Sequence, residues 1–199
     1  MTKLSIKTEK PTDLRQVILD TALNLFTTKG YFNTSVHDIK RGANVSIGAV
    51  YHHFKSKEEI AEAIYSDLLE SMTSSMAEFL AREATIQGLS KAIMGFLFEM
   101  TENHPAAMEF MLYAKHREFM PSAIPICSSR PLETMREIVQ RGMDAGEIRK
   151  MDTVLATTCL FGGMFRMINL RLDGVIKNPL PAYLETVWDC GWRGVKNTP

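Results

Sequence analysis

The sequence of 199 residues contains few cysteines, carries no net charge and has no apolar run long enough to cross a membrane. Cys127, Cys159 and Cys190 share no short spacing, so no zinc or redox pair is indicated, and we expect buried or half-buried thiols. The longest apolar stretch, residues 154–165, stops at Arg166 and is too short to span a bilayer. These absences favour a globular protein that needs neither a metal nor a membrane.

Signals of targeting, catalysis and sheet structure are also missing. Residues 1–13 are charged and lack an apolar core, so we expect a soluble, cytoplasmic protein with no membrane partner. We find no G-x-S-x-G elbow, no phosphate-cradling glycine loop and no H-E-x-x-H metal spacing, so we expect neither an enzyme nor a cofactor. No stretch alternates with a period of two, which predicts an all-α fold.

The charge is unevenly distributed along the chain. Residues 1–55 contain eight Lys and Arg against four Asp and Glu, and the remainder of the chain is acidic by the same margin. A basic N-terminal part on an acidic body is expected when only one end of a protein meets phosphates.

Residues 34–60 predict two short helices joined by a tight turn and followed by a third helix. Ser35 and Asp38 have the spacing of a capping box, Ser46 can cap the second helix, and Ser56 begins another capping box. The second helix has small residues at its front and aromatic and histidine side chains behind them. This is how a chain presents a helix to the major groove of DNA.

This segment resembles the DNA-binding region of the TetR (tetracycline-repressor) family of bacterial transcriptional regulators. The resemblance covers about a quarter of the chain. In the rest of the chain, only the general arrangement of the predicted helices is similar to that of the family. The resemblance rests on Thr34, Ser35, Val36, Asp38, Ile39, Ala43, Val45, Ser46, Gly48, Tyr51, His52, Phe54, Ser56, Lys57, Glu58 and Glu59.

Three positions depart from the family pattern. Lys40 replaces a small residue, Gly42 replaces a helix former, and Asn44 replaces the usual turn glycine. Asparagine tolerates the left-handed conformation, so the turn should survive. Gly42 should weaken the end of its helix by up to roughly 1 kcal/mol.

The resemblance implies that Ser35, Tyr51 and Lys57 contact phosphates and that the start of the second short helix faces the groove. The predicted DNA-binding residues are Ser35, His37, Ser46, Ile47, Gly48, Ala49, Tyr51, His52, His53 and Lys57. Arg, Asn and Gln, the best bidentate readers of bases, are missing from this face. The face of one subunit should therefore discriminate only weakly between DNA sequences. This argues for a homodimer on a palindromic double-stranded operator.

Two alternatives remain open at this stage. Tyr51 could merely pack against the first helix, and the whole chain could be a dimeric helical module that binds small molecules or proteins without DNA. The confinement of net positive charge to the N-terminal part argues against the second alternative.

The sequence suggests three parts: a flexible arm over residues 1–11, a helix-turn-helix domain over 12–56, and a ligand-binding and dimerisation domain over 57–199. Thr12 can cap the first helix, which Gly30 ends. Further helices are expected from Lys57 to about residue 80 and over residues 87–103, 105–119, 132–145, 153–168 and 184–192. The helix that starts at Lys57 is the one long element shared by both domains, so a shift at one end should move the other.

The body is rich in methionine, whose soft, unbranched side chain adapts to varied apolar ligands. Because members of the resembling family hold an effector in this domain, we expect a small apolar or amphipathic ligand there. The candidate contacts are Met94, Phe96, Met100, His104, Met108, Met111, Tyr113, His116, Met164, Phe165 and Asn169. The alternative is that these residues form an ordinary core.

The last two helices are expected to form the dimer surface, as a four-helix bundle with a second copy. Two tryptophans on one short helix, beside a helix that is apolar on most sides, suggest such a patch. The candidate residues are Phe161, Phe165, Leu184, Val187, Trp188 and Trp192. The alternative is that the tryptophans cover the core of their own chain.

Overall fold

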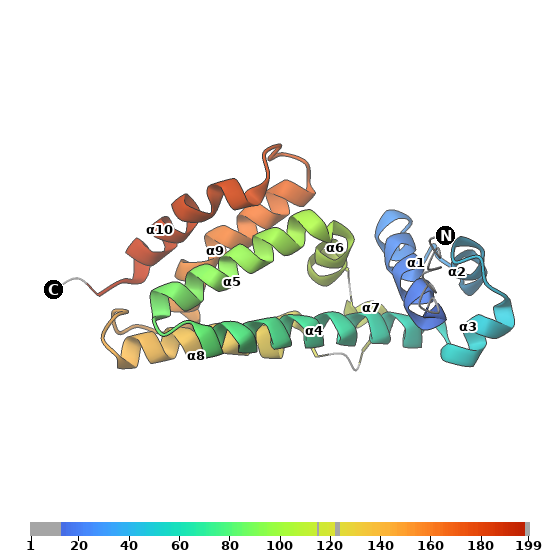
Figure 1. The fold of residues 1–199 in the computed structure, drawn as a ribbon, viewed down its shortest axis with the longest axis horizontal. Helices are drawn as coiled ribbons and strands as arrows, with labels where there is room; N and C mark the ends of the chain where they lie inside the picture. Colours follow the sequence, from blue (N-terminus) through green and yellow to red (C-terminus); the bar gives the residue numbers. More distant parts are fainter. Residues whose placement is uncertain (1–12, 115, 122–123, 198–199) are drawn as a thin grey trace, which may run out of the picture. The chain divides into compact units, whose positions relative to one another are not determined.

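The computed structural model describes residues 13–114, 116–121 and 124–197 (Figure 1). Within these ranges the chain is helical, and Ile148 and Lys196 form one isolated bridge. The all-α prediction is confirmed, while the expected flexible arm over residues 1–11 lies outside the described residues. The elements are α1 (Leu14–Thr28), α2 (Val36–Gly42), α3 (Ile47–His53), α4 (Lys57–Arg82), α5 (Ile86–Asn103), α6 (Pro105–Tyr113), α7 (His116–Phe119), η1 (Ile126–Ser128), α8 (Arg130–Asp144), α9 (Thr153–Leu172), η2 (Leu180–Tyr183) and α10 (Leu184–Val195).

The chain divides into two compact units, the first ending at Ile64 and the second starting at Tyr65. The division falls inside α4, whose first two turns belong to the first unit and whose remainder belongs to the second. The described part of the first unit therefore consists of α1, α2, α3 and the start of α4.

Local capping chemistry sets the limits of the helices in the first unit. Asp13, rather than the predicted Thr12, caps α1, and its side chain accepts from the Arg15 amide; Thr12 lies outside the described residues. Gly30 follows α1 with φ +86°, a left-handed conformation that suits glycine. Asn44 takes φ +54° between α2 and α3, so the predicted left-handed asparagine turn is confirmed.

Gly42 has a packing role that its helix propensity does not reveal. A Cβ atom at this position would lie 2.8 Å from Cγ2 of Thr21 and 3.8 Å from Cδ1 of Leu25. The missing side chain therefore lets α2 approach α1 closely, and this contact offsets the low helix propensity of glycine.

We expect Gly42→Ala to lower the free energy of unfolding by about 1 kcal/mol, because the added methyl overpacks the contact with Thr21. In a Thr21→Ser background the same substitution should be stabilising, since alanine is the better helix former. Urea unfolding of the four proteins of this double-mutant cycle measures the coupling. Equal effects of Gly42→Ala in both backgrounds would contradict the packing role.

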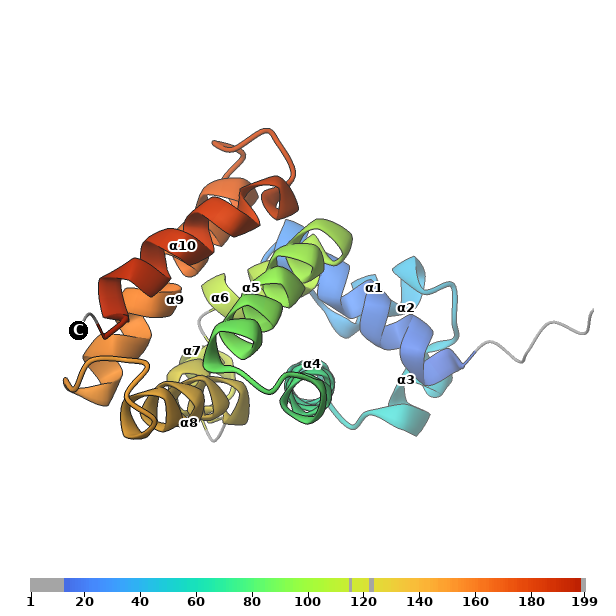
Figure 2. The same ribbon diagram turned by 60° about the vertical axis from the view of Figure 1, so that its left-hand side comes forward.

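In the second unit, α5 occupies the centre and packs against α6, α8, α9 and α10. Its inward face is buried, with Leu89, Ile93, Leu97 and Phe98 almost inaccessible. α9 and α10 run alongside each other in both views (Figures 1 and 2) and contact each other extensively.

One carboxylate joins three elements of this unit. Glu102 on α5 accepts from Nη2 and Nε of Arg171 on α9 at 2.7 and 2.9 Å, and from the Leu180 amide of η2 at 2.9 Å. These bonds, Arg171 first, lower the pKa of Glu102 and keep it ionised. Glu102 thus fixes the connection between α9 and α10 to the end of α5.

The helix expected over residues 105–119 is in fact two. α6 starts at Pro105, which occupies the first turn as expected, but it ends at Tyr113, and Ala114 has an extended conformation. Two residues after Ala114, His116 begins the short helix α7, whose Phe119 is buried. The break lets Phe119 pack into the unit, a tertiary effect that the apolar spacing did not disclose.

Candidate DNA-binding surface

The third helix presents one face to the core and the other outward. Ser46 caps α3, and its Oγ accepts from the Ala49 amide at 3.0 Å. Val50 and Phe54 are buried and hold the helix against the unit. This fixes which residues face outward.

The outward face of α3 has a small front edge followed by polar rings. Gly48, Tyr51 and His52 are exposed, and Ile47, Ala49 and His53 are half-buried. Among the side chains of the described residues, Oγ of Ser46 would lie nearest to a Cβ added at Gly48, at 3.8 Å. The front edge of the helix can therefore come close to a binding partner.

Tyr51 is 53% exposed, so most of its ring is available to a partner rather than packed against α1. Its phenol can hydrogen-bond a phosphate oxygen, which positions a duplex without reading its sequence.

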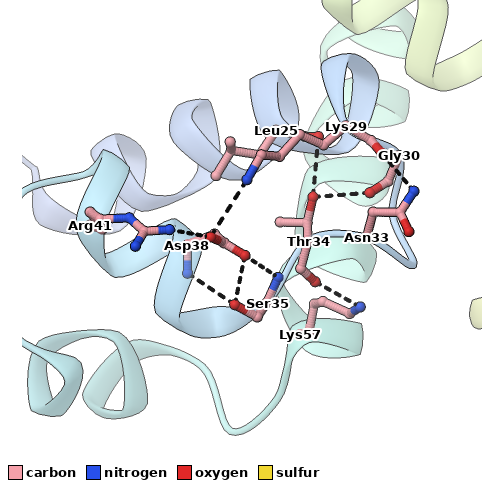
Figure 3. Close-up of polar contacts among 9 residues, drawn as sticks. All are labelled: Leu25, Lys29, Gly30, Asn33, Thr34, Ser35, Asp38, Arg41 and Lys57. Carbon is pink, nitrogen blue, oxygen red and sulfur yellow. Dashed lines mark hydrogen bonds and ion pairs between the residues drawn. The ribbon is translucent and has the colours of Figure 1, made fainter.

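A capping box holds α2, as the sequence predicted (Figure 3). The Asp38 amide donates to Ser35 Oγ at 3.1 Å, and the Ser35 amide donates to Asp38 Oδ2 at 3.0 Å. The Ser35 hydroxyl also donates to Asp38 Oδ2 at 2.7 Å. These bonds, together with the charges of Lys29 and Arg41, hold the pKa of Asp38 well below its usual range. Ser35 and His37 remain exposed at the start of α2.

Thr34 belongs to the sequence motif, but the sequence did not reveal its structural role. Its side chain is buried, and Oγ1 donates to the carbonyl oxygens of Leu25 and Gly30 at 3.2 and 2.9 Å (Figure 3). The hydroxyl thereby satisfies carbonyls at and after the end of α1 and fixes the chain that enters α2.

Lys57 is bound to the same turn. Its Nζ donates to the carbonyl oxygen of Thr34 at 2.9 Å (Figure 3). It also donates to the carbonyl oxygen of Tyr31 at 2.9 Å and lies 4.1 Å from the centre of the Tyr31 ring. The ammonium has three donors, so these two bonds use most of its capacity. The structure thus gives Lys57 a positioning role, beside the phosphate contact that the resemblance implies.

A second bond joins the start of α4 to this turn. The hydroxyl of the buried Tyr31 donates to Oε1 of Glu58 at 2.9 Å. Burial and this carboxylate raise the pKa of Tyr31 far above its usual value, so it remains a donor at every physiological pH. Lys57 and Glu58 together fasten the first turn of α4 to the loop before α2.

Comparison with known proteins is consistent with this geometry. The family model of bacterial regulatory proteins of the tetR family matches residues 18–64. The chain is 30% identical over 95 residues to IcaR of Staphylococcus epidermidis, the negative transcriptional regulator of the biofilm operon icaADBC. This match covers 46% of the chain and 49% of that protein, so the chain spans about half the length of this relative.

Other relatives are matched over more of their length. The chain is 26% identical over 144 residues to the transcriptional repressor KstR2 of Mycolicibacterium smegmatis, covering 70% of each protein. The solved structure of FadR from Bacillus subtilis in complex with stearoyl-CoA is 22% identical, with a TM-score of 0.76, and covers 90% of this chain and 98% of that chain. At this identity the structural likeness shows the fold alone.

The capped α2–turn–α3 unit, with α1 behind it and an exposed small-residue edge on α3, defines a helix-turn-helix protein. The matched residues 18–64 contain α2, α3 and most of α1. This helix-turn-helix region is therefore similar to that of bacterial regulatory proteins of the tetR family.

Two of the predicted effector residues, Phe96 and Phe165, line two different cavities. Met94, Met108, Met111 and Met164 are buried in the core of the second unit. Phe96 lines an open groove along α5, whereas Phe165 lines a separate pocket beside α9.

The polar members of that set are also dispersed. The Tyr113 hydroxyl lies 3.3 Å from the Asn169 carbonyl oxygen and 3.2 Å from Oδ1 of Asp173, so it joins α6 to α9. His104 is exposed before α6, and Met100 is half-buried.

His116 lies within a group of aromatic rings. Its ring centre is 4.7 Å from that of Tyr65, 5.0 Å from Phe110 and 5.9 Å from Phe119. Nε2 is buried without a hydrogen-bond partner among the described residues. Burial lowers the pKa of His116, and a hydrogen bond with the Phe110 backbone opposes the shift only in part. The imidazole is therefore neutral in the folded protein at pH 7.

Acid should destabilise the second unit through His116. Because its folded pKa is depressed, its contribution is fully present above the unfolded pKa of about 6.5 and is lost as the pH falls toward the lower folded value. Thermal unfolding of the wild type and His116→Phe between pH 7.5 and pH 5 tests this. The wild type should lose more stability than the variant, and parallel losses would contradict the assignment.

The predicted dimer residues are largely used within the single chain. Phe161 and Trp192 are buried, and Trp188 is half-buried, with its Nε1 donating to Ser90 Oγ at 3.0 Å. The two indole rings stack at 5.9 Å. These contacts agree with the alternative in which the tryptophans cover their own core.

α9 nevertheless keeps an apolar outer face. Among the described residues it is the helix long and apolar enough to cross a membrane, yet only 28% of that stretch is buried within the chain. Val154 and Leu155 are exposed on it. The cysteines differ from expectation, since Cys127, Cys159 and Cys190 are all exposed rather than buried.

The described residues contain no group of three or more His, Cys, Asp or Glu side chains placed to hold a metal ion.

Proposed function

We propose that this protein is a cytoplasmic transcriptional repressor of the TetR family that binds a palindromic operator as a homodimer. The observation that carries the proposal is the outward face of α3, where Gly48 and Ala49 precede Tyr51 and His52 on a helix fixed by the Ser46 cap. Relatives named as transcriptional regulators support a regulator rather than an enzyme.

The outward face of α3 would recognise the DNA sequence through a few weak contacts with base edges. Ile47 and Ala49 can meet thymine methyl groups, and His52 can hydrogen-bond a base edge. Because one such face discriminates weakly, two copies on an inverted repeat are needed. Their recognition helices would enter successive major grooves about 34–36 Å apart.

The exposed apolar face of α9 supports dimerisation through the last two helices. An apolar face of this length is costly in water unless a second copy covers it. The partly exposed side of α10, which includes Val187, would complete such a surface.

Release by an effector completes the proposal. One relative in fold is solved with stearoyl-CoA, which supports an apolar or amphipathic ligand in the second unit. α4 would transmit its binding, because the helix belongs to both units and its first turn is fastened by Lys57 and Glu58. A thousandfold loss of operator affinity requires the ligand to favour the released conformation by about 4 kcal/mol.

Fluorescence anisotropy with the DNA upstream of the protein's own gene tests the proposal, at two salt concentrations and with random DNA as competitor. We expect tight, salt-sensitive binding that survives the competitor. Ala49→Arg should abolish this binding by filling the space at the front of α3. Ala77→Arg adds the same charge at an exposed site on α4 and should leave specific binding intact.

Equal, weak binding to both DNAs by all three proteins would contradict the proposal. It would favour the alternative, a dimeric helical module that binds a small molecule or a protein without DNA.

A further inference from the structure

The second unit holds a pocket of about 220 Å³ between η1, α8 and α9. It is lined by the apolar residues Leu132, Val154, Phe161 and Phe165 and by the polar residues Arg136 and Thr157. Val154 stands at the edge of the pocket, on the α9 face proposed above to meet a second copy. Of the residues that the sequence assigned to the effector, Phe165 lines this pocket, whereas Met94 and Met164 are buried in the core.

Arg136 is the feature that gives this pocket a chemical preference. Its Nη1 donates to the Cys127 carbonyl oxygen at 2.9 Å, which holds the guanidinium beside η1. The acidic neighbours on α8 are occupied elsewhere, because Glu137 binds Arg130 at 2.6 Å and Glu133 lies 3.6 Å from the same guanidinium. Among the described residues, no carboxylate lies within ion-pair distance of Arg136.

A fixed guanidinium with unused donors, placed at the edge of an apolar pocket, is suited to one kind of ligand. Arginine binds a carboxylate through two parallel N–H bonds, and an apolar wall favours a hydrocarbon or aryl body. A neutral apolar molecule would leave the guanidinium donors unmatched, and a cation would be repelled.

We infer that the pocket between α8 and α9 binds a small monocarboxylate whose apolar body packs against Phe161 and Phe165 and whose carboxylate pairs with Arg136. The inference rests on the proposed function only in so far as the ligand is taken to control DNA binding. Binding of the ligand itself can be measured on the protein without DNA.

The pocket limits the size of the ligand. Its volume of about 220 Å³ lies below the roughly 300–1,000 Å³ of pockets that hold drug-sized ligands, so it favours a small carboxylate.

Gly162 provides a way to fill the pocket without disturbing the fold. It lines the pocket, and among the described side chains an added Cβ would meet Cγ2 of Thr158, at an ordinary 3.8 Å. A leucine there would occupy the ligand's space and would also raise the helix propensity of α9.

Isothermal titration calorimetry of the full-length protein with octanoate tests the inference. Octanoate should bind, and Arg136→Gln should weaken it tenfold or more, while Arg141→Gln, an exposed arginine on the same helix, should not. Gly162→Leu should abolish binding with an unchanged circular dichroism spectrum. Octanamide should bind the wild type at least tenfold more weakly than octanoate, and its affinity should be the same for Arg136→Gln as for the wild type.

Two results would overturn the inference: no heat from octanoate at millimolar concentration, or binding that Arg136→Gln and Gly162→Leu leave unchanged. Failure of the proposed function is separately visible. If the protein binds no specific DNA but octanoate binding still depends on Arg136, the pocket assignment stands and the repressor does not.

Discussion

Replacing Gly191 by valine should separate α10 from α9 and lower the free energy of unfolding by about 3 kcal/mol or more, roughly 6–12 °C in melting temperature. A Cβ at Gly191 would lie 2.3 Å from the carbonyl oxygen of Leu160 and 3.2 Å from its carbonyl carbon. Because these are backbone atoms inside a helix, no side-chain rotation can relieve the clash. The helices must move apart, and the buried Leu160 and Trp192 would lose packing.

Gly194 supplies the matched control on the same helix. Among the described residues, and apart from its chain neighbours and the backbone of its own helix, no atom lies within 4 Å of the position its Cβ would take, and the residue is exposed. Gly194→Ala should leave stability unchanged or raise it by up to ~1 kcal/mol through helix propensity. Thermal unfolding followed by circular dichroism measures both variants. If Gly191→Val melted with the wild type, the close crossing of α9 and α10 would be wrong.

The second large effect is expected from Lys57→Met, which keeps the length of the stem but removes the ammonium. The carbonyl oxygens of Tyr31 and Thr34 would each lose a charged donor, and the Tyr31 ring would lose its cation. We expect a loss of about 2–3 kcal/mol in the stability of the first unit. Operator affinity should fall as well, because the bond between Tyr31 and Glu58 would remain but the loop before α2 would be held less tightly to the start of α4.

Salt dependence separates this positioning role from a phosphate contact. A lysine that only neutralises a phosphate would leave stability unchanged and would reduce the slope of log affinity against log salt by about one per subunit. Lys55→Met, at an exposed lysine two residues earlier, is the control, and it should leave stability unaltered. An undiminished melting temperature for Lys57→Met would contradict the positioning role.

The features that could be predicted from sequence are those decided by a few neighbouring residues. The capping box of Ser35 and Asp38, the Ser46 cap and the left-handed turn at Asn44 depend on local hydrogen bonds and backbone sterics. The motif of the first unit also carries a specific family resemblance, which the family model matches.

Contacts between distant residues could not be predicted in the same way. Lys57 binds carbonyl oxygens 23 and 26 positions earlier in the chain, and nothing in its neighbourhood signals this. Gly42 looked like a weak helix former because its closeness to Thr21 is a property of two packed helices.

In the second unit, even more depends on contacts between distant residues, which the sequence does not reveal. Helical spacing located the methionines on the inner faces of helices but could not say whether those faces enclose a cavity or a solid core. Met94 and Met164 proved to be fully buried. Arg136 was overlooked because its significance depends on Arg130 engaging both nearby glutamates, which only the arrangement of side chains reveals.

The central claim is that the outward face of α3 reads DNA as one of a symmetric pair. Selection of bound sequences from a random DNA pool, performed in parallel with the wild type and Ala49→Arg, tests it most directly. The account predicts that the wild type enriches an inverted repeat with half-site centres about 10 base pairs apart, or a multiple of that spacing, and that Ala49→Arg loses it. Enrichment of no sequence by the wild type, or of the same inverted repeat by both proteins, would contradict it.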